Sequence, residues 1–389
     1  MSEPRKKVLV WGLTSNVGGL EMVVKNYVGR ISPSDVRFDF ATTHESMAFE
    51  DWVLELGSEV LHLPPRSKDP IGYKRAFGRF SSECLGSYDA VWLNDCRWGN
   101  LDILVKAKKV GVARRIAHAH NTRDVADGQV RILRHKANRI RIASLATDFW
   151  ACSLAAAKWC FNESLLESQR FRVVRNAVDV GRFSFDEEAR TRMRRQLGLG
   201  DLPTYINVGR LDHQKNQAFL LEAFKELLAL QPESVLLLVG GGPDEGALRA
   251  KARDLGLGDS VRFLGFRSDI PELLCSADCF MMPSLFEGLS LVLVEAQASG
   301  LPCLCSDAIT PEVAILGSLE RIPLSTGAMG WAKRMVSVEL PADRKAGVAA
   351  VRAAGYDIDA EAARLAGFFA SGGARFEPST VLKRKGGLD

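Results

Sequence analysis

The sequence has no apolar run long enough to cross a bilayer as a helix, which takes about 20 consecutive apolar residues. The apolar stretch 6–13 is followed at once by polar residues, so we expect no signal peptide and a cytoplasmic protein. Charge of one sign is also scarce, because 51 Lys and Arg face 47 Asp and Glu, a net charge of +4. No nucleic-acid-binding motif accompanies this small excess, so no nucleic-acid partner is expected.

Cysteine and histidine patterns typical of metal or redox sites are missing too. The eight cysteines include no Cys-x-x-Cys pair, and Cys152, Cys303 and Cys305 lie in apolar runs where reduced, buried thiols are expected. The one close histidine pair, His118 with His120, has no cysteine or carboxylate cluster beside it. The sequence therefore predicts no metal site and no bound cofactor.

Strand-like runs alternate with helical stretches along the whole chain, which predicts parallel, doubly wound sheets. A charged helical segment, 186–197, and the turn 198–203 separate two such series, so we expect an α/β protein of two Rossmann-like domains. The expected strands are 7–11, 36–41, 59–63, 90–93, 115–120 and 148–153 in the first series, with helical stretches such as 21–31 and 49–56, and 204–208, 235–239, 261–264, 279–282, 302–306 and 321–323 in the second.

A pair of glutamates marks the most informative part of the sequence. Glu287 lies in a polar loop after the strand-like run 278–283, and Glu295 follows eight residues later in an apolar helix. If most of this interval is helical, the carboxylates stand up to ~12 Å apart. Backbone N–H groups at the start of the helix suit an anion such as a diphosphate, and a carboxylate at each end suits hydroxyls. The alternative is that the two glutamates lie on a solvated helix face. The N–H groups belong to Gly288, Leu289, Ser290 and Leu291.

Two basic residues follow the first strand of the second series. Arg210 comes directly after Gly209, and Lys215 lies five residues further along the same loop. A planar guanidinium binds two phosphate oxygens and an ammonium acts as a compact charge, so together they suit a departing diphosphate without a metal. An arginine and a lysine on an exposed loop are the alternative.

Glycines recur where strands end. Gly18 and Gly19 follow the first strand, where they allow a backbone to approach a ligand. The loop 12–18 is too long for the dinucleotide Gly-x-Gly-x-x-Gly, so an NAD site is not expected. The run 240–242 suits a permissive turn, while the family resemblance described next implies a loop beside the nucleotide.

Taken in their order along the chain, these motifs resemble those of retaining glycosyltransferases of family 4, which have the GT-B fold. The resemblance covers about 8–369, and its departures are Ala177 where Gly is usual and Ser290 where Pro is common. A serine there can cap the helix, so the expected consequence is altered loop rigidity rather than lost activity. The motifs are Gly18-Gly19-x-Glu21, Asn176-Ala177-Val178-Asp179 with Phe183, Gly209-Arg210-x4-Lys215, Gly240-Gly241-Gly242, Phe266-Arg267-x-Asp269, and Glu287-x7-Glu295 with Gly300-Leu301-Pro302.

The resemblance implies a donor and roles for these residues. The donor is a nucleotide-diphosphate sugar, expected to be a UDP-sugar, and the acceptor is a saccharide or a lipid-linked saccharide in surface-polysaccharide synthesis. Arg210 and Lys215 neutralise the diphosphate, Glu295 binds the ribose and Glu287 positions sugar hydroxyls, while attack on the front face and double displacement both stay open. Expected donor contacts also include Gly18, Gly19, Gly209, Gly241, Phe266, Arg267, Gly288, Leu289, Ser290 and Leu291.

His120 is the candidate catalytic residue of the first half. The run 115–122 resembles the capsular and exopolysaccharide branch of the family, in which a histidine at the end of this strand faces the donor sugar. Strand alternation places His118 and His120 on one face, with His120 nearer the carboxyl end. A structural strand histidine is the alternative, and for His118 it is the favoured interpretation.

The segment 131–141 is basic and amphipathic. Such a helix face suits peripheral contact with the anionic inner leaflet, at ~1 kcal/mol per basic residue, and an ordinary solvated helix is the alternative. Its basic side has Arg131, Arg134, His135, Lys136, Arg139 and Arg141, and its apolar side has Ile132, Leu133, Ala137 and Ile140.

The expected domains are 1–177 on the acceptor side, 178–355 for the nucleotide sugar, a helix over 356–370 that returns to the first domain, and a flexible basic tail over 371–389. Asp357 and Asp359 begin that helix and are expected to cap it rather than to bind a cation.

Two other functions stay open. A GT-B-fold epimerase acting on the nucleotide sugar needs further proton-transfer carboxylates, which the sequence does not show. A silent binding subunit of a polysaccharide-assembly complex has no chemical use for the whole motif set.

Overall fold

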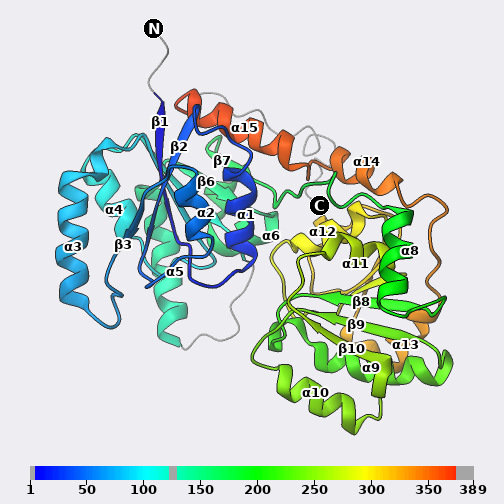
Figure 1. Ribbon diagram of the computed structural model, residues 1–389. Coiled ribbons are helices and arrows are strands. Elements are labelled where there is room, and N and C mark those ends of the chain that lie inside the picture. The colour runs from blue at the N-terminus through cyan, green and yellow to red at the C-terminus, as the bar shows by residue number, and fades with distance from the viewer. Residues whose placement is uncertain (1–4, 122–128, 374–389) are drawn as a thin grey trace. The chain divides into compact units, whose positions relative to one another are not determined.

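The computed structural model describes residues 5–121 and 129–373. The chain divides into two compact units, Met1–Ala177 with Ile358–Asp389 and Val178–Asp357, and each is described by itself (Figure 1). The expected basic tail lies outside the described residues from position 374 onward.

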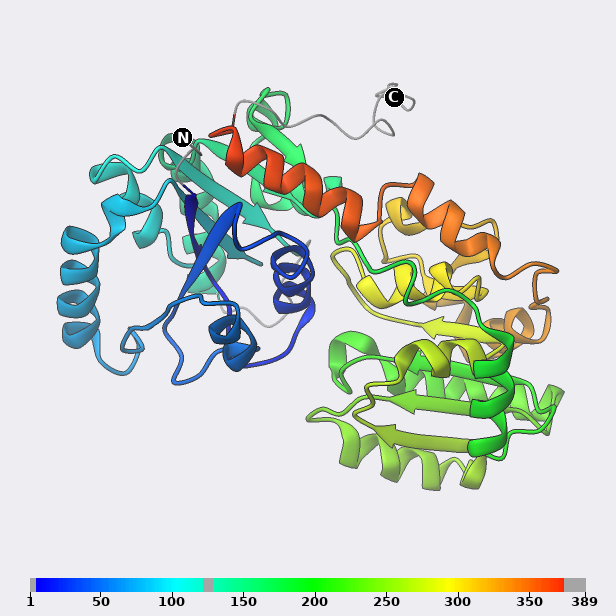
Figure 2. The same cartoon turned by 45° about the horizontal axis from the view of Figure 1, so that its top comes forward.

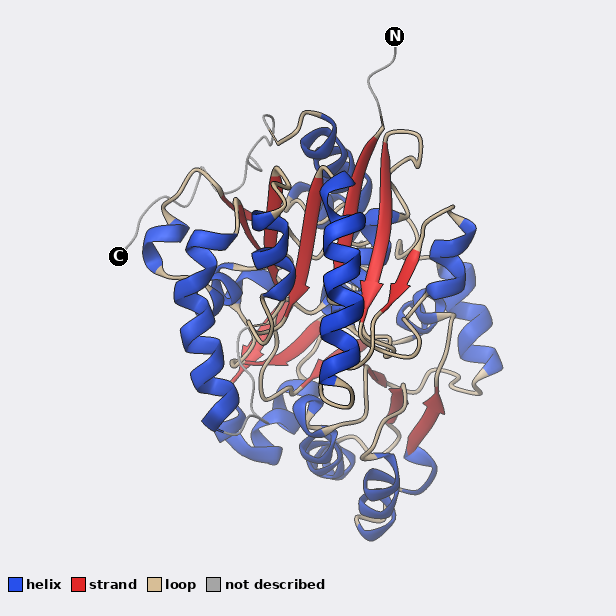
Figure 3. Cartoon of the chain, turned by 90° about the vertical axis from the view of Figure 1, so that its left-hand side faces the viewer, coloured by secondary structure: helices blue, strands red, loops and turns tan. Residues whose placement is uncertain are grey.

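The first unit is built on a seven-stranded parallel sheet with the order β3-β2-β1-β4-β5-β6-β7. Helices flank both faces of the sheet, as Figure 3 shows, so most side chains of its central strands are buried. The strands are β1 (Lys6–Trp11), β2 (Val36–Thr42), β3 (Val60–His62), β4 (Ala90–Asp95), β5 (Arg114–Ala119), β6 (Asp148–Ala151) and β7 (Phe171–Val173). The six expected strands of this series are confirmed, and β7 was not predicted.

Eight α-helices accompany this sheet in the described part of the first unit. They are α1 (Gly19–Val28), α2 (Glu50–Glu55), α3 (Pro70–Glu83), α4 (Asp102–Lys109), α5 (Gln129–Leu145), α6 (Leu154–Cys160), α7 (Glu163–Leu166) and α15 (Ile358–Ala370). The helix expected over 21–31 begins earlier, at Gly19, because the Glu21 carboxylate accepts a hydrogen bond from Gly18 N (3.2 Å) and fixes the first turn.

Helix α15 packs on the first unit although it comes last in the described chain (Figure 2). Phe368 and Phe369 contact the aromatic core of this sheet, with ring centroids 5.1 Å from Trp150 and 5.7 Å from Phe38 respectively. Such edge-to-face contacts bury large apolar area in a favourable geometry. Asp359, in the first turn of α15, forms an ion pair with Arg30 of the same unit (2.8 Å).

The second unit has a six-stranded parallel sheet with the order β10-β9-β8-β11-β12-β13. Its six expected strands are confirmed, and the last begins two residues earlier than predicted. The elements are α8 (Glu187–Gln196), β8 (Thr204–Val208), α9 (Gln217–Leu230), β9 (Val235–Val239), α10 (Glu245–Asp254), β10 (Val261–Gly265), α11 (Ile270–Ser276), β11 (Cys279–Met282), α12 (Leu291–Ala298), β12 (Cys303–Ser306), β13 (Leu319–Ile322), α13 (Gly327–Val336) and α14 (Ala346–Ala353).

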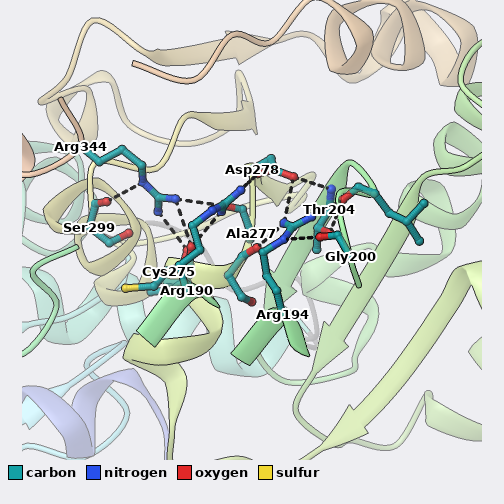
Figure 4. Close-up of polar contacts among 12 residues, drawn as sticks. Arg190, Arg194, Gly200, Thr204, Cys275, Ala277, Asp278, Ser299 and Arg344 are labelled. Carbon is teal, nitrogen blue, oxygen red and sulfur yellow. Dashed lines mark hydrogen bonds and ion pairs between the residues drawn. The ribbon is translucent and has the colours of Figure 1, made fainter. Parts of the chain in front are cut away.

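Three buried or half-buried arginines tie the amino-terminal end of this sheet to its helices (Figure 4). Arg190 and Arg194 of α8 donate to the Asp278 carboxylate at 2.6 and 3.4 Å, and Thr204 N donates to the same carboxylate at 2.8 Å. Arg344 instead donates only to backbone carbonyls among its described contacts. This cluster lies at the edge of the sheet opposite to the one that carries the motif loops.

Candidate active site

The motif loops of each sheet follow the carboxyl ends of its parallel strands. In the second unit they follow β8, β9, β10 and β11, and in the first unit they follow β1, β4 and β5. Carboxyl ends of parallel strands meet at one edge of a sheet, which is where ligands bind in doubly wound folds. Each unit therefore presents one functional edge.

Lys215 and Glu287 form an ion pair at the functional edge of the second unit. Lys215 Nζ lies 2.5 Å from Glu287 Oε1, and the two side chains are 16% and 9% exposed. The pair joins the loop after β8 to the loop after β11, so the structure brings together two residues that the sequence proposed from separate motifs. A mostly buried pair of this kind is less screened than a surface pair.

The loop that carries Lys215 has a defined shape. Asp212 accepts a hydrogen bond from Lys215 N (3.2 Å), and Asn216 adopts the left-handed conformation with φ of 55°. Asn216 Nδ2 then donates to Pro283 O (3.1 Å), and Leu285 N donates to Gln214 O (2.9 Å). These contacts fix the β8 loop against the β11 loop and thereby place Lys215 beside Glu287.

The glycines after β9 are required by packing against the β8 loop. A Cβ at Gly240 would lie 2.1 Å from Gly209 O, and one at Gly242 would lie 2.2 Å from Leu211 O. A Cβ at Gly241 would lie 2.6 Å from the Phe266 ring. Both interpretations of this run, a turn and a nucleotide loop, are compatible with these contacts, because close packing of the two loops also leaves the backbone uncovered by side chains.

Arg210 and Phe266 project from the same edge of the second unit. Arg210 is 62% exposed on its side chain, with Nε 3.6 Å from Asp212 Oδ2. Phe266 is 87% exposed, an unusual position for a large aromatic side chain. Arg267 is held by Asp269, whose Oδ1 accepts from Arg267 Nε at 2.8 Å. Arg210 and Phe266 are therefore accessible to a ligand, whereas Arg267 is partly engaged by its neighbour.

Helix α12 begins at Leu291, so less of the interval between the two glutamates is helical than the sequence suggested. Ser290 occupies the N-cap position, but its side chain makes no cap hydrogen bond, and the expected serine cap is wrong. The first turn of α12 still leaves backbone N–H groups without intrahelical partners.

Glu295 is half-buried on α12, and burial raises the pKa of its carboxyl to about 7, an effect that Arg182 opposes. Carboxyl groups in apolar surroundings favour the protonated form. Ligand hydroxyls that donate to the carboxylate would stabilise its charged form, so Glu295 suits a sugar ring with free hydroxyls.

In the first unit, Glu21 organises the loop after β1. Its carboxylate accepts from Thr14 N (3.1 Å), Thr14 Oγ1 (2.9 Å) and Gly18 N (3.2 Å). Gly18 precedes α1 and Gly19 begins it. Gly12, which the sequence did not single out, has φ of 113°, and a Cβ there would lie 1.8 Å from Asn94 O. The loop therefore lies directly against the end of β4.

His120 follows β5 at the same edge and is nearly buried. His120 Nε2 lies 2.9 Å from Asn94 Oδ1, and its ring centroid is 4.0 Å from that of His118. Burial lowers the pKa of His120 to about 3, and burial together with His120 lowers the pKa of His118 well below its ordinary value. Both imidazoles are therefore neutral near pH 7. No motif in the sequence marks Asn94.

Within residues 5–121 and 129–373, no group of three or more His, Cys, Asp or Glu side chains is placed to hold a metal ion. In the same described part of the chain, no helix is long and apolar enough to cross a membrane.

Two doubly wound units, each with its ligand-binding loops at the carboxyl ends of parallel strands, define the GT-B class of glycosyltransferase folds. Comparisons with known proteins agree. The family described as "Glycosyl transferases group 1" matches residues 189–321. EpsF of Bacillus subtilis (strain 168), a protein named as a glycosyltransferase, is 34% identical over 340 residues, which are 86% of this chain and 88% of EpsF.

Further similarities are partial in sequence or confined to the fold. A UDP-Gal:alpha-D-GlcNAc-diphosphoundecaprenol alpha-1,3-galactosyltransferase of Escherichia coli is 35% identical over 152 residues, 38% of this chain and 39% of that protein. The structure of HepE from Anabaena with UDP and glucose has a TM-score of 0.75 at 19% identity and covers 94% of this chain and 100% of that chain. WaaG, a glycosyltransferase involved in lipopolysaccharide biosynthesis, has a TM-score of 0.68 at 18% identity, covering 93% and 99%.

The chain belongs to the group 1 glycosyltransferases, family 4, and has the GT-B fold. It is therefore a glycosyltransferase, and its similarity to EpsF extends over most of both chains.

Proposed function

We propose that the protein is a retaining glycosyltransferase that transfers a hexose-type sugar from a UDP-sugar to a saccharide or lipid-linked saccharide acceptor in surface-polysaccharide synthesis. The observation that carries this proposal is the Lys215–Glu287 ion pair, with Nζ and Oε1 2.5 Å apart at the functional edge of the second unit. It places a cation for a phosphate and a carboxylate for sugar hydroxyls side by side.

The names of similar proteins support the choice of donor and acceptor. The E. coli relative uses UDP-Gal and an acceptor linked to diphosphoundecaprenol, and HepE binds UDP and glucose. We infer the nucleotide base, the sugar and the acceptor of this chain from these names together with the site residues. Both are used because specificity depends on a few pocket contacts.

Each residue of the second unit has a proposed role. Lys215 and the accessible Arg210 neutralise the negative charge that develops on the departing diphosphate, and the N–H groups at the start of α12 add partial positive charge. Glu287 positions hydroxyls of the transferred sugar, and Glu295 accepts hydrogen bonds from the ribose. Front-face attack within an ion pair and double displacement both need this neutralisation, and neither needs a metal. Remaining donor contacts are proposed at Gly18, Gly19, Gly209, Gly241, Phe266, Arg267, Gly288, Leu289, Ser290 and Leu291.

We assign the donor to the second domain, 178–355, and the acceptor to the first, 1–177, where His120 faces the sugar. The helix expected over 356–370 begins at Ile358 as α15, and the chain from Ile358 onward belongs to the first unit.

A donor screen tests the proposal. UDP-sugars, GDP-sugars and the free diphosphates are added in a thermal-shift assay, where a ligand at 100 times its Kd stabilises by ~2.7 kcal/mol. Product analysis with and without a saccharide acceptor follows. Epimerised donor in the absence of acceptor indicates the epimerase instead, and a protein that binds a donor without ever transferring it indicates the silent subunit. If no nucleotide diphosphate shifts the melting temperature, the proposal is wrong.

The Glu295 role makes a prediction about pH. Because the folded-state pKa of about 7 exceeds the ordinary 4.5, the stabilising contribution of protonated Glu295 is fully present below pH 4.5 and is lost as pH rises through 7. Ribose hydroxyls prefer the carboxylate, so UDP affinity should rise about tenfold between pH 6 and 8 through this group. Calorimetry of UDP binding to wild type and to Glu295→Gln between pH 6 and 8 measures this change in affinity. The variant retains the ionisation of UDP itself, so the difference between the two profiles isolates Glu295, and parallel profiles would contradict the role.

The first unit also presents a face that suits the anionic inner leaflet. Helix α5 turns His135, Asn138 and Ile142 toward the core, so the apolar side that the sequence identified is exposed instead. Leu133 and Ile140 are 66% and 69% exposed. His135 and Asn138 explain this orientation, since they hydrogen-bond Trp98 N and O at 3.2 and 2.8 Å.

Helix α4 extends this basic face, because Lys108 Nζ donates to Ser144 O of α5 at 2.8 Å. Residues 103–121 and 129–147 contain no Asp or Glu. Apart from Asp102 at the start of α4, the charged side chains of the two helices are basic and surround exposed apolar side chains, the pattern of an interfacial helix, so we propose peripheral contact of α4 and α5 with anionic lipid. The basic residues are Lys106, Lys108, Lys109, Arg131, Arg134, Lys136, Arg139 and Arg141.

Vesicle flotation tests this face. Binding to vesicles that contain phosphatidylglycerol should exceed binding to neutral vesicles and should weaken with salt. Lys136→Glu should reduce it by more than about fivefold, since one basic residue contributes ~1 kcal/mol and the variant also adds repulsion. Leu133→Ser should reduce it in both vesicle types. Ile71→Ser on α3, equally apolar and 73% exposed, is the matched control and should change nothing. Equal binding to neutral and anionic vesicles would contradict the proposal.

A further inference from the structure

A chain of directional hydrogen bonds links β4 to β5 in the first unit. Trp92 Nε1 lies 3.2 Å from His118 Nδ1, Asn94 Nδ2 lies 3.2 Å from Trp92 O, and His120 Nε2 lies 2.9 Å from Asn94 Oδ1. All four side chains are buried, and His120, with 7% exposed, ends the chain at the functional edge.

The chemistry of these groups decides where each proton lies. A tryptophan N–H can only donate, so His118 Nδ1 accepts from it. A backbone carbonyl can only accept, so the Asn94 amide must turn its NH2 group toward Trp92 O and its oxygen toward His120. That oxygen can only accept, so His120 carries its proton on Nε2. Both rings are neutral, as their burial dictates, and the remaining nitrogen of His120 therefore has a lone pair.

His120 Nδ1 is buried and has no hydrogen-bond partner among the described residues. An acceptor atom left unsatisfied in a protein interior is destabilising and is uncommon in native structures, where a ligand or an ordered water completes its hydrogen bond. Its natural complement is an O–H donor. The carbohydrate hydroxyl is the chemical class that offers such a donor at this edge of the sheet.

We propose that Asn94 is a positioning residue, which holds His120 with its proton on Nε2 and so presents the Nδ1 lone pair to a hydroxyl of a bound sugar. The inference rests on the proposed function for the identity of that sugar. It involves no proton transfer, since the role proposed for the Nδ1 lone pair is to accept a hydrogen bond from the hydroxyl. Asn94 itself does not touch the ligand.

The tautomer can be measured without any substrate. In 15N-histidine-labelled full-length protein, NMR should show His120 protonated at Nε2 and bare at Nδ1, with the signal assigned by its loss in His120→Gln. Asn94→Leu removes the oxygen that selects this tautomer, so the His120 signals should shift toward a mixture of tautomers. A purely structural asparagine would leave them unchanged. Asn138→Leu, which removes another buried asparagine of the same unit, is the matched control and should not alter the His120 signals.

Transfer kinetics test whether Asn94 acts through His120. Asn94→Leu should lower kcat/KM by about tenfold, the effect of one well-placed hydrogen bond. In a His120→Gln background the same substitution should have almost no further effect, because the interaction it supports is already lost. If no donor is turned over at all, the proposed function fails while the NMR result still decides the role of Asn94. His120 protonated at Nδ1 in wild type, unchanged signals in Asn94→Leu, or independent effects in the double variant would each overturn the inference.

Discussion

Replacing Lys215 with alanine is expected to lower kcat by about 10²- to 10³-fold, the loss that follows removal of one electrostatic donor from other active sites. The ammonium acts most strongly when the diphosphate departs, so turnover should fall by more than UDP affinity does. Steady-state kinetics with the donor found in the screen measure kcat, and calorimetry with UDP measures the nucleotide affinity.

Two controls keep this result specific. Lys251→Ala also breaks a lysine–glutamate pair of the second unit, the exposed one with Glu222, and should leave kcat unchanged. Lys215→Ala also removes the cation beside the buried Glu287 carboxylate, so Lys215→Ala/Glu287→Gln separates lost catalysis from the loss of this ion pair. EDTA should not affect the wild type. A kcat for Lys215→Ala within a few-fold of wild type, or loss of activity in EDTA with rescue by Mn2+, would contradict the assignment.

The fold could be predicted from the sequence because most of its strands are recognisable by their composition. Fully buried parallel strands such as β9 and β11 are continuous apolar runs between turn residues, and the twelve strand-like runs of the sequence are strands in the structure. Strand β7 could not be found in this way, since Phe171–Val173 has only three residues and a central arginine. An edge strand of this kind depends on its pairing with β6 rather than on its own composition.

The candidate site was predictable to the extent that its residues lie in local motifs. Arg210, Lys215 and Glu287 could be named because each belongs to a motif whose spacing is visible within its own loop. The contact between Lys215 and Glu287 could not be derived from the sequence. It joins residues 72 positions apart and depends on the hydrogen bonds of Gln214 and Asn216 to the β11 loop.

Residues that act by holding other residues in place are not marked by any motif in the sequence. Asn94 follows the apolar run 90–93 on β4, and its significance appears only when β5 places His120 beside it. Likewise, the orientation of α5 is set by two polar residues, His135 and Asn138, which hydrophobic periodicity assigns to the solvent. Long-range hydrogen bonds override local pattern in both cases.

Arg344→Leu is expected to destabilise the second unit by about 3 kcal/mol, because leucine removes the donor of the buried backbone carbonyls around this side chain. Its side chain lies over the Phe185 ring, and the residue is 6% exposed. Nε donates to Ser299 O at 3.1 Å and Nη2 to Leu274 O at 3.0 Å, while Nη1 donates to Cys275 O and Ala277 O (Figure 4).

These carbonyls lie at the carboxyl-terminal ends of α11 and α12, where a cation also complements the helix dipoles. Burial lowers the pKa of Arg344 to about 10, so the group is still charged near pH 7. Leucine fills much of the same volume but leaves Ser299 O and Leu274 O without this donor, at about 1–3 kcal/mol each. Because α12 also carries Glu295, the substitution should weaken UDP binding as well as stability.

Differential scanning calorimetry measures the main effect, which corresponds to a fall of roughly 6–12 °C in the melting temperature of a unit of this size. Arg334→Leu is the matched control, since it removes an arginine of the same unit whose ion pair with Glu320 is exposed at 52% and 38%. Exposed pairs contribute about 0–1 kcal/mol, so its melting temperature should change by only a few degrees. Equal shifts in the two variants would show that the carbonyl contacts of Arg344 do not stabilise the second unit.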